Sequence, residues 1–443
     1  MRSMHKTLLL PVCAAIFLTM ALAVSPAFAG SSDDRSGTVL RNWYRLTLEL
    51  VRHTPTYSPP VASRSFAYLG IAAFEVVASG DAGLVTLSGQ LNAMPPMPQR
   101  DHGREYDDAV ALQAAMSAAV RELFGNTGPT GLKAMDFIAK KLDAEASAGV
   151  GPDVAERSAA YGHAVAEAIL GWSRDDGGAV VDNLGFPSSH ILTPGPAHWV
   201  PTNLIGIQQK PLLPEWGENR TFVLPDGATC GLPPPPEYSE DEGSDFHREA
   251  REVYDTVNAL TDEQRAIARF WSDDPMLSPT PPGHWLSITL HVLDKDGHDL
   301  GDRVDALARL GIVLADAFIG CWHEKYKFDL VRPVTYVRRL IDPDWDAILI
   351  TPPFPEYPSG HSTQSGAAAD VLTDVFGENY AFTDTTHEDD GLPSRDFASF
   401  WDAAEEAGIS RLYGGIHYRA AIERGLDQGR CIAAHVNALR TRR

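Results

Sequence analysis

The sequence has few cysteines, a shortage of positive charge and few signals for β-strands. Only four of its 443 residues are cysteine, and no Cys-x-x-Cys pair occurs. A zinc site built on thiolates and a fold that depends on many disulfides are therefore poor hypotheses. The net charge of −22 at pH 7 argues against nucleic acid or anionic membranes as partners, because both bind basic protein surface.

The most apolar run lies at the N-terminus. A basic start (residues 2–6) precedes an apolar run (residues 8–24) and Ala27-Phe28-Ala29. This order is typical of a secretory signal peptide over residues 1–29, cleaved near Ala29. A retained membrane anchor is the alternative, but the run contains Pro11 and is short for a span. No later stretch looks long and apolar enough to cross a bilayer, so we expect a secreted or periplasmic mature chain without a membrane span.

Loss of the signal removes Cys13 and leaves Cys230, Cys321 and Cys431. Three is an odd number, so at most one disulfide can form within the chain. We expect the fold to be stable without a disulfide framework.

Apolar residues recur at helical spacing through most of the mature chain. In the first half this spacing predicts helices over residues 39–51, 61–78, 106–124, 130–146 and 153–172. In the second half it predicts helices over residues 244–260, 261–271, 284–293, 303–330 and 366–376. The apolar run 347–350 is too isolated to build a sheet. We expect an all-α protein of two helical bundles.

Residues 174–240 interrupt the helical pattern with many prolines and glycines. Long irregular segments in compact proteins are usually functional or disordered. Trp199 and Trp216 favour packing, so we expect this segment to cover or line a site; a plain linker is the alternative. The chain then divides into an N-terminal helical region with this loop (30–240) and a C-terminal region (241–443) that contains the motifs below.

The motif Pro358-Ser359-Gly360-His361 predicts a tight turn at the start of the helix 366–376. It brings together the Ser359 hydroxyl, the Gly360 N–H and the His361 imidazole. Free N–H groups and the helix dipole favour an anion at such a position. The turn is therefore a candidate wall of an anion-binding site.

Two further motifs supply cations. Lys325 and Arg332 are seven residues apart, which returns to nearly the same face of a helix, and Pro333 is expected to end that helix. Arg411 and His417 are six apart, which would separate them on one straight helix. The glycines at 414 and 415 permit a break that lets both side chains face one point.

Together the motifs give three cations, a hydroxyl, a turn N–H and two histidines without a carboxylate cluster. The rigid fork of arginine suits a tetrahedral oxyanion. We expect a site for phosphate or a phosphate-like oxyanion, with one histidine as ligand or nucleophile and the other as acid or base.

These motifs resemble the three-part signature shared by vanadium-dependent haloperoxidases and type 2 phosphatidic acid phosphatases. The parts are Lys-x6-Arg-Pro, Pro-Ser-Gly-His and Ser-Arg-x5-His, here residues 325–333, 358–361 and 410–417. Trp322 before Lys325, the approach Pro353–Tyr357 and a mature length of over 400 residues are more similar to the haloperoxidases. That resemblance implies a vanadate cofactor, no haem, and hydrogen peroxide, halide and a small organic acceptor as reactants.

The resemblance also implies a role for each motif residue. His417 would be the single protein ligand of vanadium, and His361 the acid or base. Lys325 would polarise peroxide bound as peroxovanadate, which halide attacks to give hypohalous acid. The groups that would hydrogen-bond the vanadate oxygens are Lys325, Arg332, Ser359, Gly360 and Arg411.

Further positions extend the resemblance, and one departs from it. Trp322 and Phe354 would line the substrate pocket, and Phe354 favours a pocket like that of the chloroperoxidases. Asp274, or its neighbour Asp273, resembles the acid that orients Arg411. Many family members have Asp four residues after the last histidine, where this chain has Ala421. Support for His417 must then come from elsewhere, such as a backbone carbonyl.

Two other functions stay open. An exported acid phosphatase of the same superfamily would phosphorylate His417 and use His361 to protonate the leaving group. A non-catalytic oxyanion-binding protein would use the cations alone. His284, His323 and His387 show no partners in the sequence, so we expect structural or surface roles for them. Homo-oligomer formation is also left open.

Overall fold

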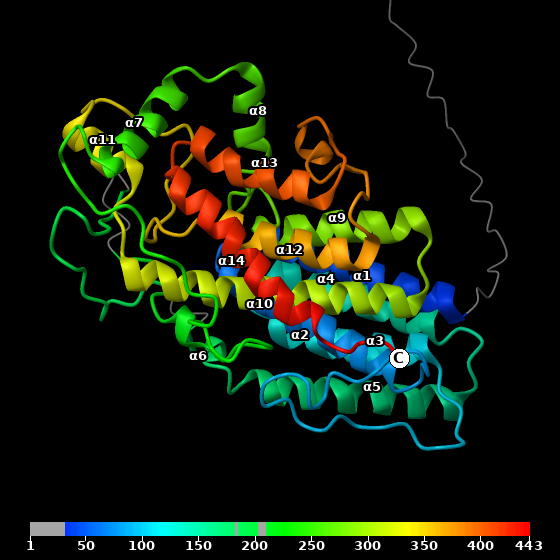
Figure 1. The fold of residues 1–443 in the computed structure, drawn as a ribbon. Helices are drawn as coiled ribbons and strands as arrows, with labels where there is room; N and C mark the ends of the chain where they lie inside the picture. The colour runs from blue at the N-terminus through cyan, green and yellow to red at the C-terminus, as the bar shows by residue number, and fades with distance from the viewer. Residues whose placement is uncertain (1–31, 182–184, 203–209) are drawn as a thin grey trace, which may run out of the picture.

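A computed structural model describes residues 32–181, 185–202 and 210–443 (Figure 1). It is predominantly α-helical, as the apolar spacing predicts. The helices before residue 182 are α1 (Ser32–Arg52), α2 (Pro59–Ala78), α3 (Asp108–Leu123), α4 (Gly128–Ala146), α5 (Pro152–Ser173) and α6 (Gly178–Val181). The later helices are α7 (Asp245–Asn258), α8 (Asp262–Phe270), α9 (Thr280–Asp296), α10 (Leu300–Phe328), α11 (Pro333–Leu340), α12 (Gly360–Phe376), α13 (Phe400–Tyr413) and α14 (Arg419–Asn437). The predicted signal peptide lies outside the described residues.

Local sequence fixes many of these helix ends. The Asp107 side chain caps α3 by accepting the N–H of Val110, and Asp299 caps α10 in the same way. Thr261 and Gln264 form a reciprocal capping box at the start of α8. Such caps satisfy N–H groups that have no partner inside the helix.

The core lies where α2 packs against α10, the central helix in Figure 1. Glycines let the two backbones approach. A Cβ atom on Gly70 would lie 2.9 Å from the Leu307 carbonyl oxygen, and one on Gly311 would lie 2.9 Å from the Ala67 Cα. In Figure 1, α12 lies on one side of α10 and α3 and α5 lie on the other, while α14 crosses α10, so α10 lies between elements of both halves of the chain. The division at residue 240 stays a prediction.

By length and composition, α2 could cross a membrane, which differs from our expectation for the mature chain. However, 94% of its most apolar window is buried inside the fold. Burial of this kind is what a helix at the centre of a core requires.

One small hairpin departs from the helical pattern. Strands β1 (Phe382–Asp384) and β2 (Arg395–Phe397) pair antiparallel between α12 and α13. The 3-10 turn η2 (Glu388–Asp390) lies between them. Residues 347–350 form no strand, as predicted. The hairpin is too short to alter the fold class, but it brings Asp384 into the interior.

The described parts of the long segment between α5 and α7 pack on the fold and include the short helix α6 and the 3-10 turn η1 (Trp216–Glu218). Trp199 and Trp216 are each only 1% exposed. The buried Asp316 carboxylate accepts backbone N–H groups from three consecutive residues of the segment, 222–224. These contacts contradict the linker alternative.

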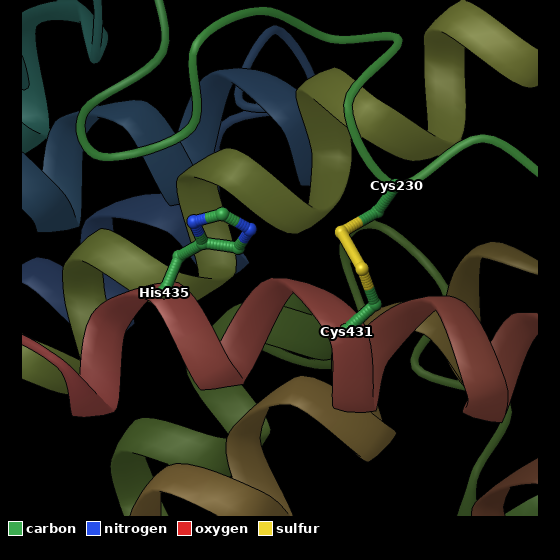
Figure 2. A group of neighbouring side chains, drawn as sticks. All are labelled: Cys230, Cys431 and His435. Atoms are coloured by element: carbon green, nitrogen blue, oxygen red, sulfur yellow. A yellow bond between two sulfur atoms is a disulfide. The ribbon is translucent and has the colours of Figure 1, made fainter.

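A disulfide joins the same segment to α14. Cys230 bonds to Cys431, and Cys321 is free and buried. Figure 2 shows that bond with His435 one helical turn further along α14. The three side chains lie close enough to hold a metal ion, but the two sulfurs are bonded to each other and are not free thiolates.

Candidate active site

The Pro-Ser-Gly-His motif forms the start of α12, as predicted. Ser359 is the N-cap residue, its hydroxyl accepts the N–H of Ser362 at 3.3 Å, and Gly360 is the first helical residue. The Ser359 N–H donates to the Ala421 carbonyl at 3.0 Å, which fixes the turn against α14. Ser359 and Gly360 therefore lie at the positive end of a 17-residue helix.

His417 lies between α13 and α14, where Gly415 (φ +78°) breaks the chain direction as predicted. Its Nδ1 is 2.8 Å from the Glu356 Oε1, and its Nε2 is 3.2 Å from the Arg332 Nη1. Burial, followed by the charges of Arg332 and its neighbours, holds the pKa of His417 well below its ordinary value. The ring is thus neutral, with Nδ1–H donated to Glu356 and the Nε2 lone pair accepting from the Arg332 Nη1–H, a contact that a ligand at Nε2 would replace.

Glu356 is a functional residue that the sequence interpretation missed. Its Oε1 accepts from His417 and also from the Tyr418 N–H at 2.9 Å, and the side chain is fully buried. Support for His417 therefore comes from a carboxyl group and not from a backbone carbonyl. Burial raises the pKa of Glu356 to about 8, against the lowering effect of Arg332 and Lys325. The sequence did contain one signal for this residue, because Glu356 is a single acid in an otherwise apolar run before the turn.

The shared helix face predicted for Lys325 and Arg332 is wrong. Helix α10 ends at Phe328 because Asp329 adopts a left-handed conformation (φ +46°). Arg332 is the N-cap residue of α11, and Pro333 begins that helix instead of ending the previous one. Proline suits a first helical turn, where its missing N–H has no intrahelical role. The two cations still lie close together, because both reach the backbone of residues 354–358.

Arg332 is fully buried beside His417. Its Nε donates to the Phe354 carbonyl at 2.9 Å and its Nη1 to the Ile416 carbonyl at 2.8 Å. Its Nη2 has no hydrogen-bond partner in the described parts of the chain. Burial lowers the pKa of this guanidinium to about 10, so it remains charged at neutral pH. A buried donor of this kind is costly unless an acceptor is bound.

Arg411 shows the same pattern from the end of α13. Its Nη1 donates to the Trp271 carbonyl, while its Nε is buried without a partner among the residues described. Burial lowers the pKa of Arg411 to about 10, and Asp273 and Asp274 oppose this effect. The predicted orienting role of Asp274 stays a prediction, because the hydrogen bond runs to the Trp271 carbonyl.

Lys325 lies behind the wall of the site. Its Nζ donates to the Pro355 and Glu356 carbonyls, each at 3.0 Å, and to the Pro358 carbonyl. These three bonds use all three of its protons, so its predicted contact with the oxyanion stays a prediction. Burial lowers the pKa of Lys325 to about 7. Its charge near the turn therefore depends strongly on what is bound there.

His361 lies on the first turn of α12, and its side chain is 16% exposed. Its Nε2 is 3.6 Å from the Asp273 Oδ2, too far for a good hydrogen bond. Burial and the nearby Arg411 lower the pKa of His361 to about 4, against the opposing effect of Asp273. His361 is thus a neutral imidazole that can accept a proton at neutral pH.

His284 and His387 are buried, which fits the structural alternative, but both have carboxylate partners that the sequence did not show. His284 is fully buried between Asp273 and Asp384, and His387 lies between Asp273 and Asp390. His323 fits its expected surface role, 3.7 Å from the exposed Glu218. The two buried histidines were missed because their partners lie on other segments, separated from them by up to about a hundred residues.

A cavity of about 560 Å³ opens above these groups. Its floor includes Gly360, His361, Arg411 and His417, and its walls are mainly apolar. The apolar and aromatic lining residues include Leu212, Phe318, Trp322, Pro352, Pro353 and Phe354. Trp322 and Phe354 both line this cavity and contact each other at a ring separation of 4.9 Å, while their role in binding substrate stays a prediction. Leu212 confirms that the long segment lines the site.

The residues fit a tetrahedral oxyanion such as vanadate. Arg332 and Arg411 each keep one buried nitrogen without a partner among the described groups, and both guanidinium groups are charged. The neutral Nε2 of His417 faces Arg332 and can ligate a metal centre. The set therefore offers one nitrogen ligand and a ring of cationic donors.

Comparisons with known proteins agree with this geometry. A family model described as the VCPO second helical-bundle domain matches residues 305–442. A vanadium chloroperoxidase from Curvularia inaequalis is 26% identical over 217 residues, which cover 35% of this chain and 36% of that protein. The aligned part is thus about a third of that relative.

Solved structures extend the match to most of the chain. A holo-type bacterial vanadium-dependent chloroperoxidase shares the fold with a TM-score of 0.68 at 16% identity, covering 91% of this chain and 94% of that one. A structure described as the first bacterial vanadium-dependent iodoperoxidase has a TM-score of 0.82 and 38% identity, covering 92% of this chain and 97% of that one. On fold, motifs and this similarity, the chain belongs to the vanadium-dependent haloperoxidase family.

Proposed function

We propose that the protein binds vanadate and oxidises halide with hydrogen peroxide to hypohalous acid. The observation that carries this proposal is the neutral Nε2 of His417, which faces a charged Arg332 whose Nη2 lacks a partner among the described residues. Bound vanadate would supply Lewis-acid activation of peroxide without a change of oxidation state.

The chain's own residues would bind the cofactor and move protons. His417 would hold the metal, and Arg332, Arg411, Ser359 and the Gly360 N–H would neutralise and orient its oxygens. His361 is unprotonated at neutral pH, so it would take a proton from incoming peroxide and pass it to the displaced hydroxide, which leaves as water. Lys325 would join the oxyanion by exchanging one of its carbonyl partners.

The apolar cavity supports a further part of the proposal. Its volume suits a small organic acceptor beside the oxyanion site, because binding cavities for such molecules usually measure a few hundred Å³ or more. Iodide, bromide and chloride are all candidate halides. The 38% identical structure is described as an iodoperoxidase, so iodide is the first halide to test.

We also propose that the protein is exported and that residues 1–29 are removed. The basic, apolar and Ala-x-Ala order of the N-terminus supports this location. N-terminal sequencing of protein recovered from the medium or periplasm tests it; a mature chain that starts near Gly30 is expected.

The decisive assay uses purified mature protein with added orthovanadate. Oxidation of iodide and bromination of a dione dye are measured with peroxide, and phosphate-ester hydrolysis is measured in parallel. We expect vanadate-dependent halide oxidation. Absence of that activity, together with brisk ester hydrolysis, would instead establish the acid phosphatase alternative.

A further inference from the structure

Three imidazoles converge on one buried carboxylate beside the pocket. Asp273 is 3% exposed and lies between α8 and α9. Its Oδ1 is 3.0 Å from the His284 Nδ1 and 3.4 Å from the His387 Nε2. Its Oδ2 is 3.2 Å from the His284 Nδ1 and 3.6 Å from the His361 Nε2. His361 therefore has the longest contact of the three.

A second layer of acids holds the two outer histidines. The His284 Nε2 is 2.8 Å from the Asp384 Oδ2, on the hairpin strand β1. The His387 Nδ1 is 3.0 Å from the Asp390 Oδ2, and Asp390 in turn pairs with Arg52 of α1. We call Asp273, His284, His387, Asp384 and Asp390 the imidazole–carboxylate cluster.

The cluster is better suited to hold charge than a metal ion. Asp273, His284 and His387 lie close enough to ligate a cation. However, His284 has a carboxylate at each ring nitrogen, which suits an imidazolium with no lone pair to donate. Burial alone would lower the pKa of His284, but Asp273 and Asp384 outweigh it and raise the pKa to about 10. The ring also stacks on Trp271 at a centroid distance of 4.4 Å.

This arrangement controls how much of the Asp273 charge reaches His361. An opposite charge nearby favours a protonated imidazole, and a like charge disfavours it. His284 hydrogen-bonds both oxygens of the carboxylate, and the His387 Nε2 lies 3.4 Å from it without a hydrogen bond, so both weaken its effect on His361, and His284 weakens it more. On the pocket side, the charged Arg411 faces His361 as well, with Asp274 and the neutral His417 close to them.

We propose that His284 and His387 are positioning residues for His361, which compete with it for the Asp273 carboxylate and so keep its ring free to accept a proton. This proposal rests on the proposed function in one respect only, namely that His361 acts as the acid or base in halide oxidation. The cluster itself predicts properties of the enzyme without vanadate.

The test compares His387→Gln, His284→Gln and Asp273→Asn with the parent protein. Histidine-labelled full-length protein without vanadate is titrated by NMR, and the His361 ring signals are assigned with His361→Gln. Removing either competing histidine should raise the apparent pKa of His361 by about 1 pH unit. Asp273→Asn should shift it in the opposite direction, because the carboxylate nearest the His361 ring, which favours the imidazolium, is gone.

Controls separate this effect from general damage. His298→Gln removes a histidine that pairs with Asp302 at the far end of α10, and it should leave the His361 titration unchanged. His284→Gln leaves two carboxylates buried without their cation, so it is the variant at risk of misfolding. His387→Gln lies at the edge of the cluster and carries the test alone if His284→Gln does not fold.

The pH profile of halide oxidation supplies a second readout. In His387→Gln the acid limb of kcat should move to higher pH, with KM for halide nearly unchanged. An unchanged His361 titration in His387→Gln, or shifts of the same sign in His387→Gln and Asp273→Asn, would overturn the proposal. Failure of the proposed function gives a different result. In that case the His361 pKa shifts with the expected signs, but the protein oxidises no halide.

Discussion

Glu356 allows a sharp test of how His417, the proposed metal ligand, is held. Its Oε1 is the acceptor for both the His417 Nδ1–H and the Tyr418 N–H, at 2.8 and 2.9 Å. Groups that orient a ligating imidazole typically change metal affinity by about 10- to 100-fold when removed, or about 1.4–2.8 kcal/mol. We therefore expect Glu356→Ala to weaken vanadate binding by about that factor. Each buried donor left unpaired also costs about 1–3 kcal/mol of stability.

Glu356→Gln separates the hydrogen bond from the charge. The Gln carbonyl can accept both hydrogen bonds. A neutral Gln side chain also does not repel the vanadate anion. We expect the vanadate Kd of this variant to remain within a few-fold of the parent value. Because burial raises the pKa of Glu356 to about 8, a neutral side chain here resembles the parent near neutral pH.

Isothermal titration calorimetry with orthovanadate gives the dissociation constants, and circular dichroism confirms that each variant is folded. Glu249→Ala is the matched control, because this half-buried acid accepts the Ala420 N–H at 3.3 Å near the same helix start. If Glu356→Ala binds vanadate as tightly as the Glu249→Ala control, the assigned role of Glu356 is refuted.

Three further outcomes are expected. His417→Ala should reduce vanadate affinity severely, whereas His361→Ala should retain binding and lose turnover. Calorimetry and a halide assay on both variants distinguish the two roles. Full activity of His417→Ala would contradict the ligand assignment. Changing Cys230 and Cys431 to serine should lower the free energy of unfolding by about 2–4 kcal/mol, measured in urea, with vanadate affinity preserved in the folded variant. The pKa of His361, about 4 in the free protein, should rise when vanadate binds, because the anion stabilises the imidazolium. Halide oxidation should then slow as the pH drops through the pKa of the vanadate-bound form. A stopped-flow pH series checks that the rate falls towards acid pH.

Much of the fold could be predicted from apolar spacing, because most of the longer helices bury apolar residues at helical spacing. The run at residues 61–78, for example, lies within α2, the helix that packs on α10. The break after Lys325 could not be predicted in the same way. Seven-residue spacing suggested one helix through Arg332, but Asp329 takes a left-handed conformation that few non-glycine residues adopt. Proline then marked a helix start, and proline alone does not distinguish a start from an end.

The candidate site divides along similar lines. Arg411 and His417 were predicted because they stand within short motifs whose spacing can be read directly. The cluster around Asp273 was not, because His284 and Asp384 lie a hundred residues apart and meet only in the folded chain. Glu356 was likewise invisible as a partner of His417, although both flank motif residues. Sequence spacing shows local chemistry, whereas pairs between distant segments require the packing of the helices.

The cavity lining comes from segments far apart in the described chain, from Pro55 after α1 to His417 before α14. The groups proposed to hold vanadate likewise lie on separate segments, from Arg332 to His417, so the site forms only in the folded protein. If the chain crosses a membrane unfolded, vanadate must be acquired afterwards, from the compartment in which the protein works. Bound vanadate then stabilises the folded protein. At a free vanadate concentration of one hundred times its Kd, the free energy of unfolding rises by about 2.7 kcal/mol. External vanadate supply would thus set how long each exported molecule survives, as well as how fast it turns over.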